Sequence, residues 1–333
     1  MNTQPLAVKI AGVGWYLPSK RVTSDELSQT LGLKTGVIER ATGIMERRYA
    51  HDETSAFMAA QAAHMALDHA GVTVDQLDAI IGASTAMQQV VPCTAAFVQR
   101  ELNAPEGRSV CFDLNATCLS FVVALQNAAH LIAAGVYERV LIYSSEIVSP
   151  SLNPNEWESA ALFGDAAAAV VLMRSAAHET SAIWHSKFAT FHSGAELTQC
   201  VGGGTLHHPN DPTTTREMNM FQMNGPQVFR QAVRLMQPFV ADFFADLGWQ
   251  PEQIDVVVPH QASRHAVEQL SARLGFRPDQ VFSNLALRGN CVAASIPLAL
   301  AEAVHAGRIK RTDRVLLIGT GAGLTLGAVA LTF

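Results

Sequence analysis

The amino-acid sequence predicts a layered α/β fold of two similar halves, because two patterns each occur twice in the same order. A polar segment that leads into a short apolar run, typical of a strand, is found at 74–81 and again at 251–258. An alanine-rich and almost wholly apolar segment occupies 118–135, and a similar one occupies 291–307. Two matches in the same order favour an internal duplication over coincidence.

Each alanine-rich segment is expected to form a buried helix, since a helix that is apolar on most sides must be covered on most sides. A glycine ends each segment and suits the left-handed cap position. Apolar runs of strand type follow at 140–142 and 315–318. Buried helices that lead into buried strands predict helices between sheets. We expect an N-terminal half at 1–176 and a C-terminal half at 177–333, joined by the polar segment 174–182.

The composition is that of a compact enzyme. Of the 333 residues, 49% are hydrophobic and 16% charged, which excludes a disordered or nucleic-acid-coating protein. The net charge of -6 gives no overall attraction to phosphates or anionic membranes. No leader sequence is recognisable at the start, and the longest apolar stretch, 166–173, is too short to span a bilayer. Five cysteines without a CxxC pair predict neither disulfides nor zinc. We expect a cytoplasmic protein without metal or cofactor, and with neither nucleic acid nor membrane as a partner.

Cys118 is the first candidate for chemistry. It follows the strand-like run 110–114 and lies at the expected start of the first buried helix. The N–H groups and partial positive charge of a helix N-terminus lower the pKa of a thiol and favour the nucleophilic thiolate. The alternative is a small buried apolar residue, which is the usual role of a free cysteine.

His260 and Asn290 are the next candidates. His260 ends the apolar run 254–259, and the tip of a buried strand is where α/β enzymes place catalytic groups. A histidine satisfied by a local carbonyl is the alternative. Asn290 opens the second buried helix at the place that mirrors the approach to Cys118. Position alone favours an N-cap role for Asn290.

The glycine-rich turn 319–323 follows a predicted strand and superficially resembles a dinucleotide-binding loop. It lies too close to the end of the chain for the helix and acidic residue that such a loop requires. A tight turn that lends backbone N–H groups to an oxyanion is the better interpretation.

Taken together, these motifs resemble the β-ketoacyl-acyl-carrier-protein synthase III group of the thiolase superfamily over essentially the whole chain. The segments that carry the resemblance are 11–18, 41–47, the Cys118 segment, Phe163-Gly-Asp165, Pro259-His-Gln-Ala262, Gly289-Asn290 with 294–297, and the glycine turn. The resemblance implies a thiolase-like, five-layered α-β-α-β-α sandwich, a homodimer, and a catalytic triad of Cys118, His260 and Asn290.

The resemblance also implies a two-step acyltransferase reaction. Cys118 would take an acyl group from acyl-coenzyme A or an acyl carrier protein. A second thioester, malonyl or acyl, would lose CO2 or a proton and attack that group to give a 3-oxoacyl product, in fatty-acid-like or secondary-metabolite synthesis. His260 and Asn290 would donate hydrogen bonds to the enolate, and the N–H groups of Cys118 and Ala322 would hold the oxyanion of acyl transfer.

Several positions depart from the family pattern and predict a specialised relative. Val37 and Ala41 stand where a tryptophan and an arginine usually grip the adenine of coenzyme A. Trp157 replaces a further arginine and is a candidate to stack on that adenine instead. Arg40, Arg264 and His265 are candidates to receive an acidic carrier protein, although a solvated surface is at least as good an interpretation. The residues predicted to contact substrate are Val91, from the partner chain, together with Leu119, Trp157, Ser263 and Thr320.

Two other functions stay open. One is acyl transfer from Cys118 to an oxygen or nitrogen acceptor, but Asn290 favours condensation because ester formation needs no enolate clamp. The other is a non-catalytic subunit of a heterodimeric synthase, against which the complete triad argues. Cys291 is a rival nucleophile for which core packing is expected, and Asp165 is expected to be a structural turn residue.

Overall fold

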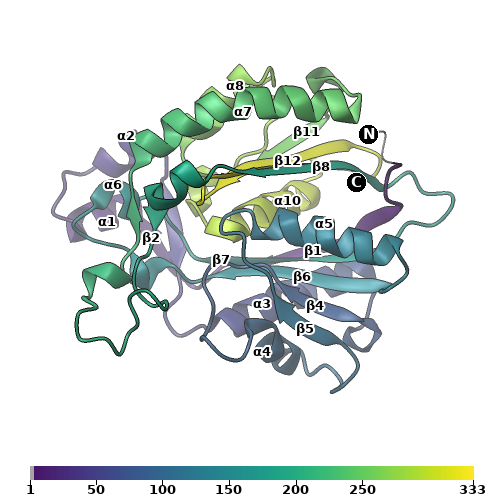
Figure 1. The fold of residues 1–333 in the computed structure, drawn as a ribbon, viewed down its shortest axis with the longest axis horizontal. Helices are drawn as coiled ribbons and strands as arrows, with labels where there is room; N and C mark the ends of the chain where they lie inside the picture. Colours follow the sequence, from purple (N-terminus) through teal and green to yellow (C-terminus); the bar gives the residue numbers. More distant parts are fainter. Residues whose placement is uncertain (1–3) are drawn as a thin grey trace.

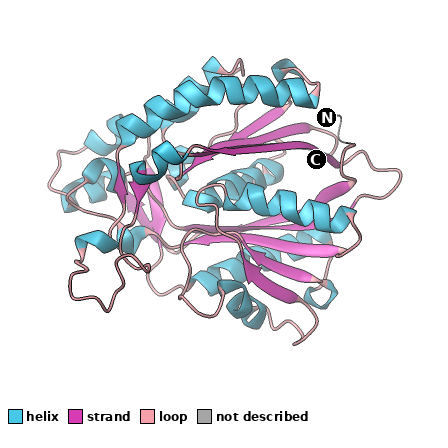
Figure 2. Cartoon of the chain, in the orientation of Figure 1, coloured by secondary structure: helices cyan, strands magenta, loops and turns pink. Residues whose placement is uncertain are grey.

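The computed structural model describes residues 4–333, which form five layers (Figure 1). Two sheets alternate with three layers of helices, and Figure 2 shows the same layers with helices and strands in separate colours. The predicted five-layered α-β-α-β-α sandwich is therefore confirmed.

The N-terminal sheet has the strand order β1-β7-β6-β4-β5. β4 is parallel to β5 and β6, whereas the β6–β7 and β7–β1 pairs are antiparallel. Helices α3 (Ser55–Ala70) and α4 (Thr94–Glu101) lie on its outer side. A side chain on Gly12 would lie 2.1 Å from the carbonyl of Ala66, so glycine lets α3 approach β1 closely. The strands are β1 (Val8–Tyr16), β4 (Ala79–Gly82), β5 (Val110–Asp113), β6 (Arg139–Glu146) and β7 (Ala166–Arg174).

The C-terminal sheet repeats this arrangement with the order β11-β12-β13-β8. β11 and β12 are parallel, and the β12–β13 and β13–β8 pairs are antiparallel. In place of a strand that matches β5, Val281 makes a single parallel bridge to Val257. Helices α7 (Gly225–Leu247) and α8 (Arg264–Arg273) lie on the outer side. The strands are β8 (Ala182–Thr190), β11 (Val256–Pro259), β12 (Arg314–Gly321) and β13 (Thr325–Thr332).

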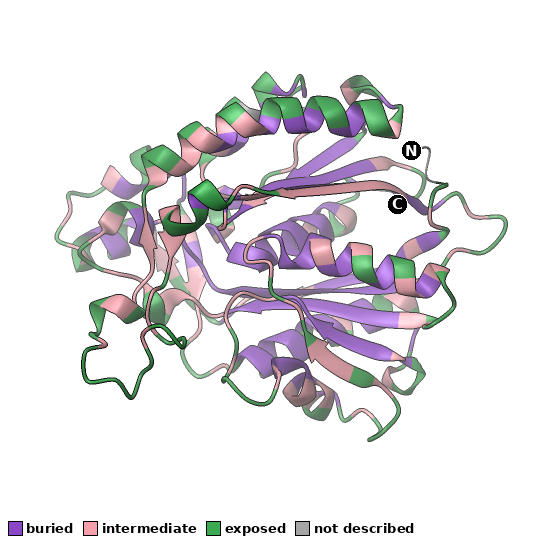
Figure 3. Ribbon diagram, in the orientation of Figure 1, coloured by how far each residue is buried: buried purple, intermediate pink, exposed green. Residues whose placement is uncertain are grey.

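The two alanine-rich segments form the central layer, as helices α5 (Ser120–Ala133) and α10 (Ser295–His305). Most of their residues are buried, because a sheet lies on each side of them (Figure 3). Gly135 and Gly307 follow the helices with φ of 78° and 69°, which confirms the predicted left-handed caps. The chain then enters β6 and β12, also as predicted.

The two sheets divide the chain between β7 and β8. Every strand of the first sheet lies within 8–174 and every strand of the second within 182–332. The boundary at 176/177 falls in the connection between them, and the division into two domains stays a prediction.

The remaining elements are short and sit around one end of the sandwich or in its connections. The segment 192–223 contains only brief helical turns and a two-residue pair of strands. None of the helices within 4–333 is both long enough and apolar enough to cross a membrane. The short elements are β2 (Lys20–Thr23), α1 (Ser24–Thr30), α2 (Val37–Thr42), β3 (Glu46–Tyr49), η1 (Val74–Gln76), η2 (Ser149–Ser151), α6 (Trp157–Ala160), η3 (His192–Leu197), β9 (Thr198–Gln199), η4 (Glu217–Asn219), β10 (Gln222–Met223), η5 (Pro251–Gln253), α9 (Leu285–Arg288) and η6 (Val292–Ala294).

Candidate active site

Cys118 lies in the tight turn between β5 and α5. Thr117 has a φ of 53°, a left-handed conformation that β-branched residues rarely adopt and that is found where the surrounding structure enforces it. Two side chains hold the turn: Asn115 Oδ1 accepts from the Thr117 N–H at 2.8 Å, and Ser120 Oγ donates to the Thr117 carbonyl at 2.7 Å. The helix begins at Ser120, so the thiol lies just before its first turn.

The thiol of Cys118 does not have the lowered pKa that its position before a helix predicted. Burial raises its pKa to about 12, and the negative charge of Glu146 acts in the same direction. The backbone N–H groups of Ala322 and Cys118 lower the pKa by hydrogen bonding to the sulfur, but the loss of water outweighs them. That expectation was wrong because position along the sequence does not measure burial. The same two N–H groups are those predicted to hold an oxyanion.

Alkylation of Cys118 should therefore be slow at neutral pH and should quicken as the pH rises. Below a pKa of about 12 the thiolate fraction grows about tenfold per pH unit, so the rate with iodoacetamide should do the same between pH 7 and 10. Glu146→Gln removes a negative charge and should raise the rate at each pH. Intact mass against time measures both rates, and a plateau below pH 9 would contradict the raised pKa.

Glu146 is a buried carboxyl group at the end of β6 that the sequence analysis did not single out. It accepts hydrogen bonds from the N–H groups of Thr85 at 2.6 Å and Ala86 at 2.9 Å, and from the N–H of Ala293. Burial raises its pKa to about 7. The carboxyl group thus ties the segment after β4 to the start of the C-terminal central helix. The only feature of the sequence that could have pointed to Glu146 is that it ends the strand that begins with the apolar run 140–142.

The glycine turn 319–323 joins β12 to β13 in the C-terminal sheet and brings Ala322 next to the turn that contains Cys118. Thr117 Oγ1 donates to the Ala322 carbonyl at 3.3 Å. A side chain on Gly321 would lie 2.7 Å from Thr117 Oγ1, which is too close for any residue but glycine. The turn between β12 and β13 therefore packs directly on the segment that holds the nucleophile candidate.

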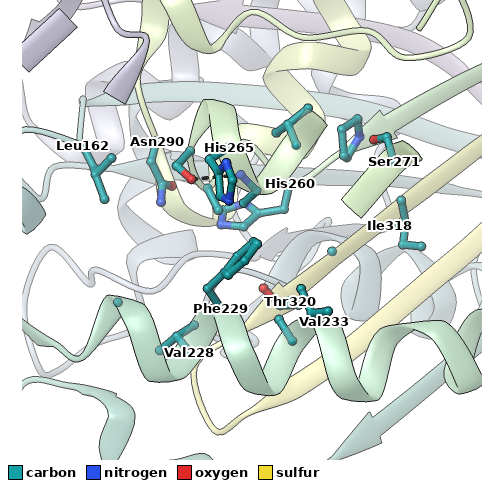
Figure 4. Close-up of a pocket in the computed structure, with 18 of the residues that line it drawn as sticks. Leu162, Val228, Phe229, Val233, His260, His265, Ser271, Asn290, Ile318 and Thr320 are labelled. Carbon is teal, nitrogen blue, oxygen red and sulfur yellow. Dashed lines mark hydrogen bonds between the residues drawn. The ribbon is translucent and has the colours of Figure 1, made fainter. Parts of the chain in front are cut away.

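His260 directly follows β11, and its N–H donates to the Ile318 carbonyl at 2.8 Å. The residue is 7% exposed, and burial lowers the pKa of its imidazole to about 4, so the ring is neutral at pH 7. Its Nδ1 atom has no hydrogen-bond partner among residues 4–333. In Figure 4 the ring faces the cavity between α7 and α8.

Asn290 uses its two amide atoms differently. Oδ1 accepts from the Val292 N–H at 2.9 Å and from Ser295 Oγ at 3.4 Å, much as a cap would. Nδ2 has no acceptor in the described part of the chain, and the side chain faces the cavity (Figure 4). The backbone of Asn290 bonds to Leu162 and Gly164 at 2.7 and 3.1 Å, which anchors it to the N-terminal half. The amide nitrogen is thus held at the wall of the cavity with no acceptor among the described residues.

Two adjoining cavities meet at these residues. The first has a volume of about 330 Å³ and is lined by Cys118, His260 and Asn290 together. The second, of about 380 Å³, shares His260, Asn290 and Thr320 with the first and continues between α7 and α8. The structure thus brings the three residues of the predicted triad to one cavity from three separate segments.

Of the residues predicted to contact substrate, only some line the two cavities. Ser263 lines the second cavity, and Thr320 lines both. Leu119 is fully buried in the central core and lines neither cavity. Trp157 is half-buried, packs against the small apolar cluster that contains Ile38, and lines neither cavity. Val91 is 76% exposed and is not among the residues that line the two cavities of its own chain.

Other polar candidates have structural partners. Arg264 donates to the Gly43 carbonyl at 3.2 Å. Asp165 is buried and accepts from the N–H groups of Ala50 and Val148, which is the expected turn role. Cys291 is buried in the core, where burial raises the pKa of its thiol. Within residues 4–333 no cluster of histidine, cysteine and carboxylate side chains is arranged to hold a metal ion.

Comparison with protein-family models finds two matches that follow one another along the chain. Residues 112–191 match the model described as 3-oxoacyl-[acyl-carrier-protein] synthase III, and residues 244–333 match the C-terminal model of the same enzyme. The first match contains Cys118, and the second contains His260, Asn290 and the glycine turn.

Comparison with whole proteins agrees over nearly the full length. The β-ketoacyl-[acyl-carrier-protein] synthase III of Neisseria meningitidis serogroup B is 36% identical over 330 residues, which cover 98% of this chain and 99% of that protein. The crystal structure of the enzyme from Aquifex aeolicus has a TM-score of 0.88 and 36% identity, and covers 98% of this chain and 100% of its own. The enzyme from Pseudomonas aeruginosa also has a TM-score of 0.88, with 34% identity and 98% of each chain covered. The chain therefore belongs to the β-ketoacyl-[acyl-carrier-protein] synthase III family.

Proposed function

We propose that this protein loads an acyl group from an acyl thioester onto Cys118 and condenses it with a second thioester, malonyl or acyl, to give a 3-oxoacyl product. Members of this family are acyl-transferring condensing enzymes, and the chain matches them over almost its whole length. The observation that carries the assignment of residues is that Cys118, His260 and Asn290 line one cavity.

In the first step, the sulfur of Cys118 would bond to the acyl carbon of the donor. The donor's thiolate leaves and takes up the proton that the Cys118 thiol gives up, so no other reactant is needed. The N–H groups of Cys118 and Ala322 would stabilise the oxyanion that develops beside the sulfur, and their hydrogen bonds to the sulfur in the free protein support this role.

In the second step, two donors would hold the enolate of the second thioester. The Nδ2 of Asn290 lacks an acceptor in the described chain, and its orientation is fixed by the bonds that Oδ1 makes. The imidazole of His260 is neutral, because burial lowers its pKa to about 4, and it donates from whichever ring nitrogen carries the proton. Preorganised donors of this kind stabilise a developing negative charge most strongly in a cavity that excludes water.

The acyl donor in this proposal is acyl-coenzyme A or an acyl carrier protein. All five cysteines are free thiols in the structure, which supports a reducing, cytoplasmic setting.

Product analysis tests the function directly. The protein would be incubated with acyl donors from two to sixteen carbons, on coenzyme A or carrier protein, together with a malonyl or acyl thioester. Mass spectrometry should detect a 3-oxoacyl thioester. An acyl-enzyme that releases its acyl group only to added alcohols or amines would contradict condensation. Absence of any acyl-enzyme with every donor would favour a non-catalytic subunit.

A homodimer is part of the proposal, and an exposed apolar region beside β5 supports it. β5 forms an edge of the N-terminal sheet, so one side of its backbone is unpaired within the sheet. Large apolar side chains near this edge are exposed: Met87, Val90, Val91 and Val110 are 56%, 80%, 76% and 45% exposed. A second copy that paired through β5 would cover them.

Val91→Asp should therefore weaken the dimer at least about tenfold, because a carboxylate buried in an apolar interface has no compensating partner. Sedimentation velocity over a range of concentrations measures the dissociation constant. Leu287→Asp introduces the same charge at another exposed apolar residue, on α9, and should leave the constant unchanged. A monomeric wild type, or equal effects of the two variants, would contradict this interface.

A further inference from the structure

We propose that the part of the second cavity beyond His260 holds an alkyl chain of the second thioester, so that both condensation partners are chain-bearing acyl thioesters. This inference rests on the function proposed above and names the class of its second substrate.

The second cavity extends well past the reacting residues. Figure 4 shows Leu162 and Asn290 toward one end, Ser271 and Ile318 toward the other, and His260 between them. The first end shares its wall with the cavity that contains Cys118. A malonyl group would be consumed at His260 and Asn290 and would leave the far end unused.

The far end is a slot between the C-terminal sheet and the helices outside it. Ile318 and Thr320 lie two residues apart on β12, so their side chains share the face of the sheet that α7 covers. Val233 of α7 and Val267 of α8 line the slot on the side opposite the sheet. The slot therefore starts at the wall shared with the Cys118 cavity and runs back along the strand.

The length of the slot suits a chain of medium length. From Thr320 back to Leu316, the residue paired with Val257 on β11, the strand runs four residues, or about 13 Å at ~3.3 Å per residue. A zigzag hydrocarbon with bonds of about 1.5 Å covers this distance with roughly ten carbons.

The lining of the slot is suited to hydrocarbon. No lysine, arginine, aspartate or glutamate lies among the described residues that line the second cavity, and its only titratable side chains there are the imidazoles of His260 and His265. Each methylene buried in such a place increases affinity about fourfold. The apolar residues at the far end are Val233, Val257, Val267, Leu274, Phe276 and Ile318.

The reaction with such a substrate balances without a further reactant. The α-carbon of the second thioester, which bears the chain, forms a bond to the acyl carbon on Cys118. The bond from that carbon to the sulfur breaks with its electron pair, and the sulfur takes up the proton that the α-carbon loses. The product is a 2-alkyl-3-oxoacyl thioester, the free thiol is regenerated, and no carbon dioxide is released.

The experiment separates the two substrates in time. The full-length protein is first loaded with a deuterated octanoyl group, freed of donor, and checked by intact mass. Acyl-coenzyme A thioesters from four to twelve carbons, or malonyl-coenzyme A, are then added and the product is quantified. The wild type should use longer second thioesters better, by about fourfold in kcat/KM per methylene up to roughly ten carbons.

Val233→Phe should fill the slot and lower the use of a ten-carbon second thioester at least tenfold, while loading of octanoyl stays within twofold of wild type. Ala241→Phe adds the same bulk at an exposed position of α7 and should change neither value. Leu197→Phe, which lies on the wall of the Cys118 cavity alone, should impair loading instead. Thermal unfolding confirms that each variant is folded.

Three results would overturn the inference: condensation with malonyl-coenzyme A alone, no dependence on the length of the second chain, or an equal loss in Val233→Phe for short and long chains. Failure of the protein to load octanoyl or any other acyl group would instead contradict the proposed function itself. Intact mass shows this failure before the second thioester is added, so the two outcomes are distinguishable.

Discussion

Alanine in place of Cys118 should abolish the acyl-enzyme, and with it the condensation product. The sulfur is the only atom of that side chain that can carry the acyl group, and loss of a covalent nucleophile typically lowers kcat by several orders of magnitude. We therefore expect no added mass after incubation with any donor, and product formation reduced about 10⁴-fold or more.

The matched control is Cys291→Ala. Cys291 occupies the corresponding place in the second half, but it is buried in the core. Its replacement should leave the acyl-enzyme and the rate of condensation within about threefold of wild type, with a modest loss of stability. An adduct that persists in Cys118→Ala and disappears in Cys291→Ala would reverse the assignment of the nucleophile.

Variants of His260 and Asn290 should separate the two steps. His260→Ala should retain loading of Cys118 but lower the rate of condensation about 10²–10³-fold, the usual loss when one preorganised donor is removed from a developing anion. Single-turnover experiments, which follow the acyl-enzyme and the product separately, measure both rates. His178→Ala, at an exposed residue of the connection between the sheets, should alter neither.

Asn290→Asp is the sharper test of the asparagine. A carboxylate keeps the acceptor for Val292 and Ser295 but replaces the Nδ2 donor by a negatively charged oxygen. Condensation should fall at least as far as in His260→Ala, because the carboxylate repels the enolate, while loading persists. Normal condensation in this variant would show that Nδ2 does not contact the second thioester, and Asn290 would then be a cap only.

The fold was largely predictable because the duplicated patterns mark equivalent elements. The repeats at 74–81 and 251–258 become β4 and β11, which occupy matching places in the two sheets. The two alanine-rich segments become α5 and α10, the helices between the sheets. The distribution of apolar residues around a helix or strand indicates how much of its surface must be buried by neighbouring elements. For α5 and α10 this indicated burial on both sides, and therefore a layer of helices between two sheets.

The chemistry of the site was harder to predict, since it depends on burial and on the direction of side chains. Nothing in the sequence shows that Glu146 would be buried close enough to raise the pKa of Cys118. Leu119 follows the candidate nucleophile but is buried in the core, and Trp157 is half-buried against the cluster that contains Ile38. The position of these two residues in the sequence does not show which way their side chains face.

The unequal edges of the two sheets bear on how many copies can join. The first sheet ends in the complete strand β5, whereas the matching place in the second sheet holds one bridge, at Val281. If both places held complete strands, each molecule would offer two similar edges, and pairing could continue from one molecule to the next into a fibre. In the dimer proposed above, a twofold contact through β5 would use this edge in both molecules, so pairing through it would stop at two copies. Divergence of the two halves at this place would thus leave one edge of the β5 kind in each molecule of the proposed dimer.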